Sequence, residues 1–257
     1  MTIPSLFWHN LFSMAAGKNV GASVPARAAA PRTVRHKPGR SRLHWIISLL
    51  LLCLPAGVKA QQPAVVTFSL DFPGSEPSHY AISVSSNGHS TYDSDGKLSP
   101  DSEGDPFHLE FSMSPETSRR IFDLAERAHY FEGEVDSRKK NLASTGVKTL
   151  TYKDAGRSTT ATYNYSMVAA VQQVTQLFQS LSTTLEFGRR LEYFHRYQKL
   201  ALDEELKRMD DAASRNDLEE MAAVLPILQR IVTDTSVINP VRARAQRMIE
   251  RAGSPKR

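Results

Sequence analysis

The stretch Tyr80-Ala-Ile-Ser-Val-Ser-Ser-Asn-Gly-His-Ser-Thr-Tyr92 decides the fold of this chain. Large apolar residues alternate with smaller ones from Tyr80 to Val84, which is the period of a half-buried β-strand. Asn87-Gly88 follows directly, and this dipeptide accepts the positive φ angles at both centres of a type I′ turn. The stretch therefore predicts a β-hairpin whose second strand is Ser90–Tyr92.

The same alternation appears on both sides of this hairpin. It predicts further strands at Val66–Phe72, Phe107–Met113, Val147–Asp154 and Arg157–Asn164. Ser114-Pro115-Glu116 then predicts a helix start, because serine caps a helix, proline suits its first turn and glutamate favours its positive end. Residues 61–183 are therefore predicted to form an α+β domain, with an antiparallel sheet of about five to six strands packed on one or two helices.

After this domain the apolar spacing is helical to the end of the chain. Thr183-Thr184-Leu185-Glu186 matches a capping box and predicts a new helix start. That helix is expected to reach about Ala213, and Pro226 is expected to kink the helix that follows. Residues 184–252 are thus predicted to form an all-helical C-terminal extension, made of a long helix and a helical hairpin, and residues 253–257 a disordered tail.

Residues 1–60 have the three parts of a secretory signal. A basic segment leads into the apolar run Trp45–Leu54, and Val58-Lys59-Ala60 places small residues before a cleavage point. As a helix this run is about 15 Å long, roughly half of a hydrocarbon core. We predict a basic N-terminal extension plus a cleavable signal peptide, cut after Ala60, and an exported chain that is periplasmic or extracellular. The alternative is an uncleaved signal that anchors the chain to the membrane.

Charge and cysteine content narrow the function classes. The whole chain carries 32 Lys and Arg against 27 Asp and Glu. Eight of these basic residues and no acidic residue lie in 1–60, so cleavage leaves 24 basic against 27 acidic residues. A mildly acidic mature chain lacks the basic footprint of a nucleic-acid-binding domain. Cys53 is the only cysteine and leaves with the signal, so no disulfide, thiol nucleophile or thiolate metal site is expected.

Two patterns are similar to metal sites. Asp93-Ser94-Asp95-Gly96 matches the centre of a calcium loop, but the first and twelfth positions of that loop fall on Thr91 and Ser102, which have no carboxylate. A polar turn is the alternative interpretation. His79 and His89 are placed to come near each other across the hairpin, without a third ligand. No metal site and no cofactor is therefore predicted.

Patterns typical of catalysis are weak in this chain. It has no Gly-x-Ser-x-Gly elbow, no glycine-rich phosphate loop and no dinucleotide fingerprint. Glu132, Glu134 and Asp136 form an acidic cluster beside Arg138-Lys139-Lys140, which favours a self-neutralising solvated loop. The alternative is a hydrolase that uses this loop or His108. No catalytic residue is predicted.

The helical extension carries the expected interaction surface. Its candidate residues are Tyr193, Tyr197, Leu200, Arg244, Arg247 and Arg251. The first three belong to a second apolar face of a helix, which is either sandwiched in the fold or exposed for assembly. The three arginines give the last helix a basic side, which suits contact with an anionic surface or an acidic partner; solvated cations near a helix C-terminus are the alternative.

The segment Tyr80–Tyr92, followed by a strand, a capped helix and a Thr-rich hairpin, resembles a family of uncharacterised secreted bacterial α+β domains. In that family a Tyr-containing strand, a Gly turn and a second Tyr recur near the N-terminus, and the resemblance covers about residues 64–183. Many members have a Cys-Pro pair before the first Tyr, whereas Ser75-Glu76-Pro77-Ser78 stands there in this chain. The family has no assigned activity, so the resemblance implies only the fold and an exported location.

Together these observations favour an exported binding or envelope-interaction module that is not an enzyme. The expected partner is a protein or envelope component, with peripheral contact to an anionic surface and no nucleic acid. Two alternatives remain open. One is a periplasmic hydrolase with a carboxylate/His site, and the other is an assembly module that associates through the helical extension.

Overall fold

The computed structural model describes residues 62–98 and 104–253. The predicted signal peptide, its cleavage point after Ala60 and Ser102 of the calcium-loop pattern lie outside these residues, as does the end of the predicted tail, 254–257. All the described residues belong to one compact unit of the chain. Within them, no helix is both long enough and apolar enough to cross a membrane.

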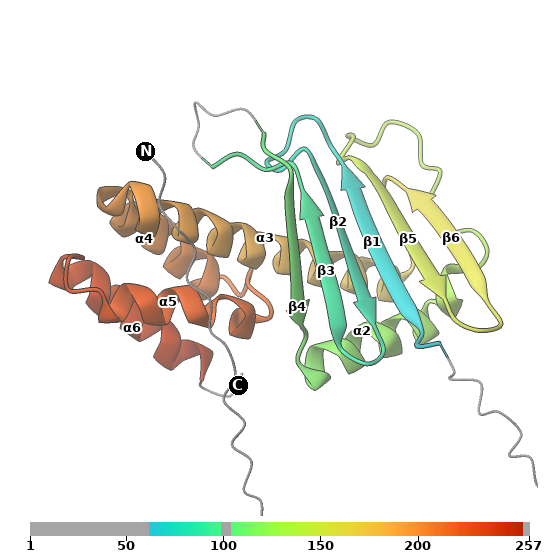
Figure 1. Cartoon of the computed structure of the whole chain (residues 1–257). Helices are drawn as coiled ribbons and strands as arrows, with labels where there is room; N and C mark the ends of the chain where they lie inside the picture. Colours follow the sequence, from blue (N-terminus) through green and yellow to red (C-terminus); the bar gives the residue numbers. More distant parts are fainter. Residues whose placement is uncertain (1–61, 99–103, 254–257) are drawn as a thin grey trace, which may run out of the picture. The chain divides into compact units, whose positions relative to one another are not determined.

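Six antiparallel strands form one sheet in the order β4-β3-β2-β1-β5-β6 (Figure 1). The strands are β1 (Val65–Asp71), β2 (His79–Ser85), β3 (His89–Ser94), β4 (Phe107–Ser112), β5 (Val147–Lys153) and β6 (Ser158–Tyr163). Each strand pairs antiparallel with its neighbours, so β4 and β6 are the edge strands. With the helices that follow, this confirms the predicted α+β fold with a helical C-terminal extension.

The hairpin between β2 and β3 is present, but its turn differs from the predicted type I′ turn. Val84 pairs with Ser90, so Ser85 lies opposite His89 and the loop between them has three residues. A type I′ turn has a two-residue loop. The Gly88 N–H donates to the Ser85 carbonyl at 2.8 Å, and the φ angle of Gly88 is 89°, whereas that of Asn87 is not positive. This is a type I turn followed by a left-handed glycine, so only Gly88 needs the conformational freedom of glycine.

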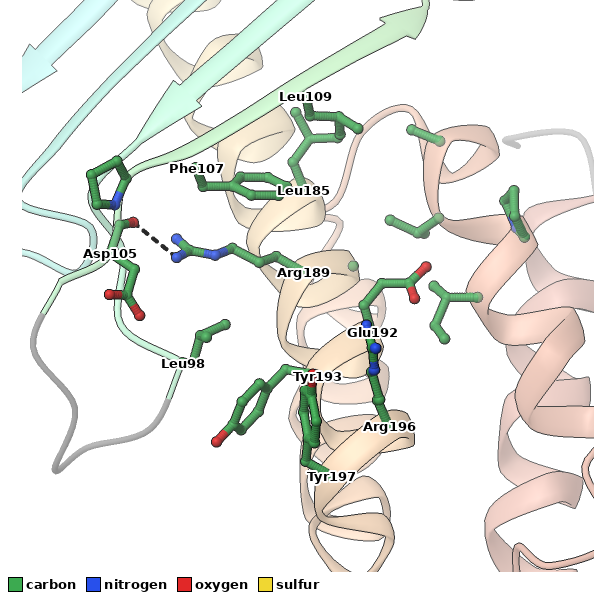
Figure 2. Close-up of a pocket in the computed structure, with 16 residues that line it drawn as sticks. Leu98, Asp105, Phe107, Leu109, Leu185, Arg189, Glu192, Tyr193, Arg196 and Tyr197 are labelled. Carbon is green, nitrogen blue, oxygen red and sulfur yellow. Dashed lines mark hydrogen bonds between the residues drawn. The ribbon is translucent and has the colours of Figure 1, made fainter. Parts of the chain in front are cut away.

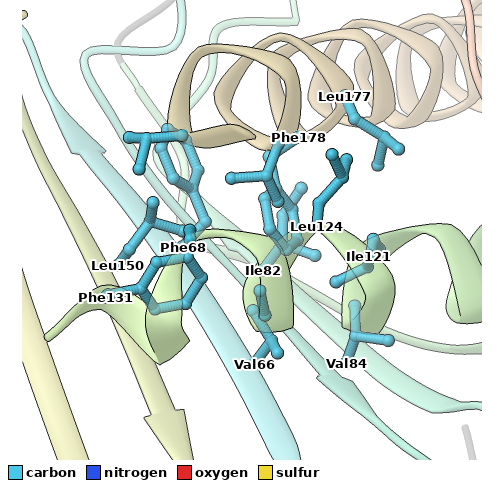
Figure 3. Close-up of a cluster of buried hydrophobic side chains, with 14 of the residues drawn as sticks. Val66, Phe68, Ile82, Val84, Ile121, Leu124, Phe131, Leu150, Leu177 and Phe178 are labelled. Carbon is cyan, nitrogen blue, oxygen red and sulfur yellow. The ribbon is translucent and has the colours of Figure 1, made fainter. Parts of the chain in front are cut away.

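The core of the α+β part lies between the sheet and two helices, α2 (Pro115–Arg127) and α3 (Ala169–Tyr197) (Figure 3). Phe68 of β1 stacks on Phe178 of α3 with 5.3 Å between ring centroids, and both side chains are fully buried. A short 3₁₀ helix, η1 (His129–Phe131), closes this core at the end of α2. The alternation of apolar and polar residues in the strands therefore places one face of the sheet against the helices.

Ser114 caps α2 as predicted, and it also connects α2 to the helical extension. Its Oγ accepts a hydrogen bond from the Thr117 N–H at 3.3 Å, which confirms the cap. The same hydroxyl donates to Glu220 Oε2 at 2.8 Å, and the Ser114 N–H donates to Glu220 Oε1 at 3.1 Å. The start of α2 is thus held by a buried carboxylate from a distant part of the chain.

The predicted helix start at Thr183-Thr184-Leu185-Glu186 is wrong, because α3 runs through these residues without a break. The Thr184 hydroxyl donates to the Ser180 carbonyl one turn earlier at 2.9 Å, instead of capping a new helix. Glu186 is buried against β3 and is not available for a capping box. The helix then ends at Tyr197, so the predicted unbroken helix to about Ala213 is also wrong.

The rest of the extension is η2 (Lys199–Ala201), α4 (Leu202–Ser214), η3 (Met221–Val224), α5 (Leu225–Thr233) and α6 (Asn239–Ala252). Pro226 does not kink a helix as predicted, because it lies in the first turn of α5. In that position the missing N–H of proline has no helical partner to lose. The 3₁₀ helix η3 precedes it, and Glu220 starts η3 with a left-handed φ angle of 53°.

Helix α3 contributes to two hydrophobic cores. Its buried residues up to Leu185 pack with the sheet and α2, and those from Phe187 onward pack with α4, α5 and α6. The boundary predicted between 183 and 184 therefore lies inside one continuous helix. Gly188 of α3 allows the helical extension to approach closely, because a Cβ atom there would lie 2.6 Å from Val224 Cγ1.

Candidate functional site

A cavity of about 510 Å³ lies beside the edge strand β4, between α3 and the η3–α5 segment (Figure 2). Phe107 and Leu109 of β4 form one wall, and Ala223 and Ile227 form part of the opposite wall. Leu98 and Asp105, which precede β4, close one end of it. The cavity thus lies where the edge of the sheet, the long helix and the helical extension meet.

The side chains that line this cavity follow the two-residue period of β4 and the four-residue spacing of α3. Along β4, alternate residues point to the same side of the sheet, so Phe107 and Leu109 face the helices together. Along α3, residues four apart lie on one face, and Leu185, Arg189 and Tyr193 therefore form a continuous stripe toward the cavity. The sequence contains both periods, but only the packing of β4 against α3 makes them opposite walls.

Arg189 is the buried charged group on the cavity wall, with a side chain that is 6% exposed. Its Nη2 donates to the Asp105 carbonyl at 2.9 Å, and its guanidinium lies 4.8 Å from the centroid of the Phe107 ring. Its Nη1 donates to Ser94 Oγ at 3.5 Å. These contacts hold the planar group in place, and two of its five N–H groups are used by the described residues.

Behind Arg189, the carboxylate of Glu186 joins α3 to β3. Glu186 is 3% exposed, and its Oε1 accepts hydrogen bonds from Tyr92 Oη at 2.8 Å and Ser94 Oγ at 2.6 Å. Its Oε2 lies 3.9 Å from Arg189 Nη1 and 3.9 Å from Arg190 Nη1. Burial and then the charge of Glu186 raise the pKa of Tyr92, so the phenol stays protonated and donates.

Sequence reasoning missed the role of Glu186 and treated it as the last residue of a capping box. The signal that points to its burial is its helical position, four residues after Ser182, on the face that packs against the sheet. Ser182 Oγ lies 3.0 Å from Tyr92 Oη and belongs to the same polar group. A glutamate on the buried face of a helix needs partners from another element, and the sequence does not name them.

Of the predicted interaction residues on α3 and η2, Tyr193 and Tyr197 line the cavity and Leu200 does not. Tyr193 is half-buried and lines the cavity together with Tyr197, whose ring centroid is 5.2 Å away. Tyr197 is 61% exposed and Leu200 is 92% exposed. Arg196 lies over the Tyr197 ring at 5.2 Å, and it forms no ion pair with another described residue. This part of the cavity therefore combines exposed aromatic surface with a cation that has no ion-pair partner among the described residues.

The predicted basic residues of the last helix lie elsewhere and are partly neutralised. Arg244 pairs with Asp203 at 3.4 Å, and Arg251 pairs with Asp210 at 2.7 Å, so both connect α6 to α4. Arg247 is exposed. The structure thus brings Tyr193 and Tyr197 to the cavity, and it does not bring these arginines there.

The expectation that His79 and His89 come near each other is wrong. Residues meet across a hairpin when they are equally far from its turn, and His89 directly follows the turn whereas His79 begins β2. His79 instead pairs with Asp71 at 2.6 Å, on the neighbouring strand. In 62–98 and 104–253 there is no group of three or more His, Cys, Asp or Glu residues that could hold a metal ion.

The carboxylates of the calcium-loop pattern have separate local partners. Asp93 Oδ1 lies 2.6 Å from His108 Nδ1. Asp95 accepts hydrogen bonds from Ser78 Oγ at 2.6 Å and from the His79 N–H at 2.8 Å. These bonds are typical of a polar turn beside a sheet, which was the alternative interpretation.

The acidic loop and His108 lie at opposite edges of the sheet. Glu132 pairs with Arg157 at 3.4 Å, and Asp136 accepts a hydrogen bond from the Asn164 N–H at 3.1 Å, so the loop is next to β6. His108 belongs to β4 and faces away from the cavity, on the outer side of the sheet. The structure therefore does not combine these groups into one carboxylate/His site.

Lys148 is a buried cation beside a second cavity of about 280 Å³. Its burial lowers the pKa of the ammonium group. Its Nζ donates to the Thr145 carbonyl at 2.9 Å, to Thr145 Oγ1 at 2.8 Å and to the Asn164 carbonyl at 3.0 Å. An ammonium group has three N–H donors, and these bonds use all three. Lys148 therefore connects Thr145, which precedes β5, to Asn164, which follows β6, and keeps no donor for a ligand.

The pKa of His108 is expected to lie above its ordinary value of 6.5, because Asp93 accepts its hydrogen bond and adds a negative charge. A raised pKa stabilises the folded chain below pH 6.5, and this contribution is lost as the pH rises through the folded pKa. Asp93→Asn should lower the pKa of His108 in an NMR titration. Asp71→Asn, which removes the partner of His79, serves as the control, and an unchanged His108 in Asp93→Asn contradicts the prediction.

Comparison with known proteins adds no assignment to this geometry. No family model matches the chain. No curated protein matches it either.

Proposed function

We propose that this protein is an exported binding module whose ligand occupies the cavity between β4, α3 and α5. The observation that carries the proposal is the cavity itself. Its volume of about 510 Å³ lies within the range of ligand sites, and most of its walls are apolar or aromatic. Arg189, held in place by Asp105 and Phe107, supplies the oriented polar group that such a site needs.

The residues around the cavity favour binding over catalysis. Its described lining includes no histidine, cysteine or serine. Its two carboxylate residues are Asp105 and Glu192, and Glu192 forms an ion pair with Arg230. Neither carboxylate has a histidine, serine or cysteine beside it in the described lining, so no nucleophile–base pair is present there. The hydrolase alternative would have to use His108 or the acidic loop, both of which lie outside the cavity.

The exported location is the second part of the proposal, and the sequence of residues 40–61 supports it. The weak family resemblance agrees with that location. The N-terminus of the purified native protein tests it. Cleavage after Ala60 would make Gln61 the first residue, and a native chain that starts well before Gln61 would contradict export with cleavage.

A variant that fills the cavity should weaken the binding of an aromatic anion. Anilinonaphthalene sulfonate is the probe, since its rings suit Tyr193 and its sulfonate suits Arg189. We expect Ala223→Trp, which places an indole in the cavity, to weaken dye binding about tenfold or more relative to the natural chain. Fluorescence titration measures the affinity and the number of dye molecules bound.

Ala222→Trp is the matched control, because Ala222 is the exposed neighbour of Ala223 and does not line the cavity. Equal dye binding by the two tryptophan variants would contradict the proposed site. The natural ligand can then be sought by mass spectrometry, as the compound from an envelope extract that the natural chain and Ala222→Trp retain and Ala223→Trp does not.

Assembly through the helical extension is the second candidate function. The observation in its favour is the exposure of two large apolar side chains at the end of α3, Tyr197 and Leu200, at 61% and 92%. Light scattering of the purified chain tests it. A monomer at all concentrations would contradict assembly through these two residues.

A further inference from the structure

We infer that the ligand of this cavity is an extended peptide that adds antiparallel to the outer edge of β4 and places its C-terminal carboxylate in the part of the cavity that Arg189 and Arg196 line. This inference rests on the proposed function and names its ligand class. Three observations carry it: the pattern of backbone hydrogen bonds along β4, the position of Arg189 at the start of β4, and the charge of the arginines that line the cavity.

The alternation of backbone hydrogen bonds along β4 shows which of its N–H and C=O groups point away from β3. The Met113 N–H donates to the Gly88 carbonyl at 2.9 Å, so these opposite residues form a hydrogen-bonded pair. Such pairs alternate with non-hydrogen-bonded pairs along an antiparallel ladder. The backbone groups of Phe107, Leu109 and Phe111 therefore bond to β3. Those of His108 and Glu110 point outward, and β4 is the last strand of the sheet on this side.

An outward edge of this kind is a template for a further strand. The N–H and C=O groups of an edge strand pair with an extended peptide in many recognition domains, and alternate side chains of the peptide then enter pockets. A strand beside β4 would lie about 4.8 Å from it. On that side, alternate side chains of the peptide would enter the cavity, which Leu109 of β4 and Ala223 of η3 line.

The direction of the peptide follows from the position of the arginines. Arg189 contacts the Asp105 carbonyl and the Phe107 ring, so its guanidinium lies at the start of β4, and Arg196 lines the same cavity two turns further along α3. A peptide antiparallel to β4 runs from Leu109 toward Phe107 and therefore ends near Arg189, in the cavity that Arg196 also lines. Antiparallel addition also continues the pattern of the sheet, in which all neighbouring strands are antiparallel.

The charge at this end of the cavity suits a carboxylate. Arg196 forms no ion pair with another described residue, and Glu192 between the two arginines is already paired with Arg230. Arg189 keeps N–H groups that the described residues do not use. Hydrogen bonds between arginine and carboxylate are charge-assisted and are among the strongest in proteins. A free peptide C-terminus supplies this group at the place where the added strand ends.

Selection from a random heptapeptide library displayed with free C-termini tests the inference. The enriched peptide is synthesised with an N-terminal fluorescein, and its affinity is measured by fluorescence anisotropy. We expect the C-terminal amide of the same peptide to bind about tenfold more weakly or worse, since it lacks the charge that the arginines bind. Arg196→Gln should cause a loss of similar size, and because Arg196 is exposed this variant keeps the fold.

A proline on the edge of the sheet tests strand addition separately. Glu110→Pro removes an outward N–H, and proline is tolerated on edge strands, so the peptide should bind about tenfold more weakly or worse. Thr160→Pro is the matched control. Thr160 lies on the other edge strand, β6, opposite Thr151 in a non-hydrogen-bonded pair, because the Asp154 N–H donates to the Arg157 carbonyl. Thermal unfolding of both variants checks that the sheet is intact.

Each of three outcomes would overturn the inference: no enriched peptide, equal affinity of the acid and the amide, or equal binding by Glu110→Pro and Thr160→Pro. A dimer of the natural chain that Glu110→Pro dissociates would also overturn it, because β4 would then pair with a second copy. The dye experiment separates this failure from failure of the site. If the natural chain binds the dye, Ala223→Trp weakens that binding and no peptide binds, then the cavity takes another class of ligand.

Discussion

Replacement of Glu186 by alanine is expected to lower the free energy of unfolding by about 3–5 kcal/mol. The carboxylate is 3% exposed and accepts hydrogen bonds from Tyr92 and Ser94. It also lies 3.9 Å from the guanidinium groups of Arg189 and Arg190. Its removal leaves the Ser94 hydroxyl without its acceptor and the buried guanidinium of Arg189 without its counter-charge, and breaking a buried pair in this way is strongly destabilising. Urea unfolding followed by circular dichroism measures the loss.

Glu192→Ala is the matched control for this experiment. Glu192 lies on the same helix and forms an ion pair with Arg230, but its side chain is 49% exposed. Solvent screens such a pair, so its loss should cost about 1 kcal/mol or less. If the two glutamate variants unfold at the same urea concentration, Glu186 does not hold α3 to the sheet in the way described.

Replacement of Phe178 by alanine is expected to cost about 3–5 kcal/mol for a different reason. Its ring is fully buried and stacks on Phe68 at 5.3 Å, in the middle of the layer between the sheet and α3. The change removes apolar contacts and leaves a cavity that the surrounding residues fill only in part. The same urea experiment measures it, and Phe178→Leu, which keeps most of the volume, should lose less than about 1.5 kcal/mol.

Met167 provides the comparison for Phe178. It precedes α3 and is 63% exposed, so Met167→Ala should change the free energy of unfolding by about 0.5 kcal/mol or less. A loss for Phe178→Ala that is no larger than the loss for Met167→Ala would contradict the packing of α3 on the sheet.

These two residues show why α3 is central to the candidate site. Phe178 attaches its first half to the sheet, and Glu186 fixes the point at which the helix leaves the sheet. The second half, from Phe187 onward, belongs to the core of the helical extension. Arg189 and Tyr193 extend from this junction into the cavity. The shape of the cavity therefore depends on one continuous helix that both cores hold.

The strands and the start of α2 could be predicted because their signals are local. Alternation from Tyr80 to Val84 and the cap at Ser114 each need only a few neighbouring residues. The turn type at Asn87-Gly88 was predicted wrongly, because the dipeptide alone does not set the length of the loop. The register of β2 against β3 sets the length of the loop, and this register comes from the apolar faces of whole strands.

The helical extension shows the limit of local signals more clearly. Taken alone, Thr183 to Glu186 predicts an N-cap, which contributes about 1 kcal/mol to helix stability. Glu186 instead bonds to Tyr92, 94 residues away in the chain, and the helix continues. Pro226 shows the same limit, since the spacing placed it inside a helix and packing made it part of the first turn of α5.

The sequence by itself therefore determined the elements of this protein: six alternating strands, a capped helix and a helical C-terminal extension. Hydrophobic periodicity and capping act over a few residues, which is why they can be read along the chain. Only the tertiary structure decided the cavity. The contact between Arg189 and the Asp105 carbonyl joins residues 84 apart, and the packing of α3 against both cores creates it. Such contacts depend on how whole faces fit together, and no short stretch of sequence contains that information.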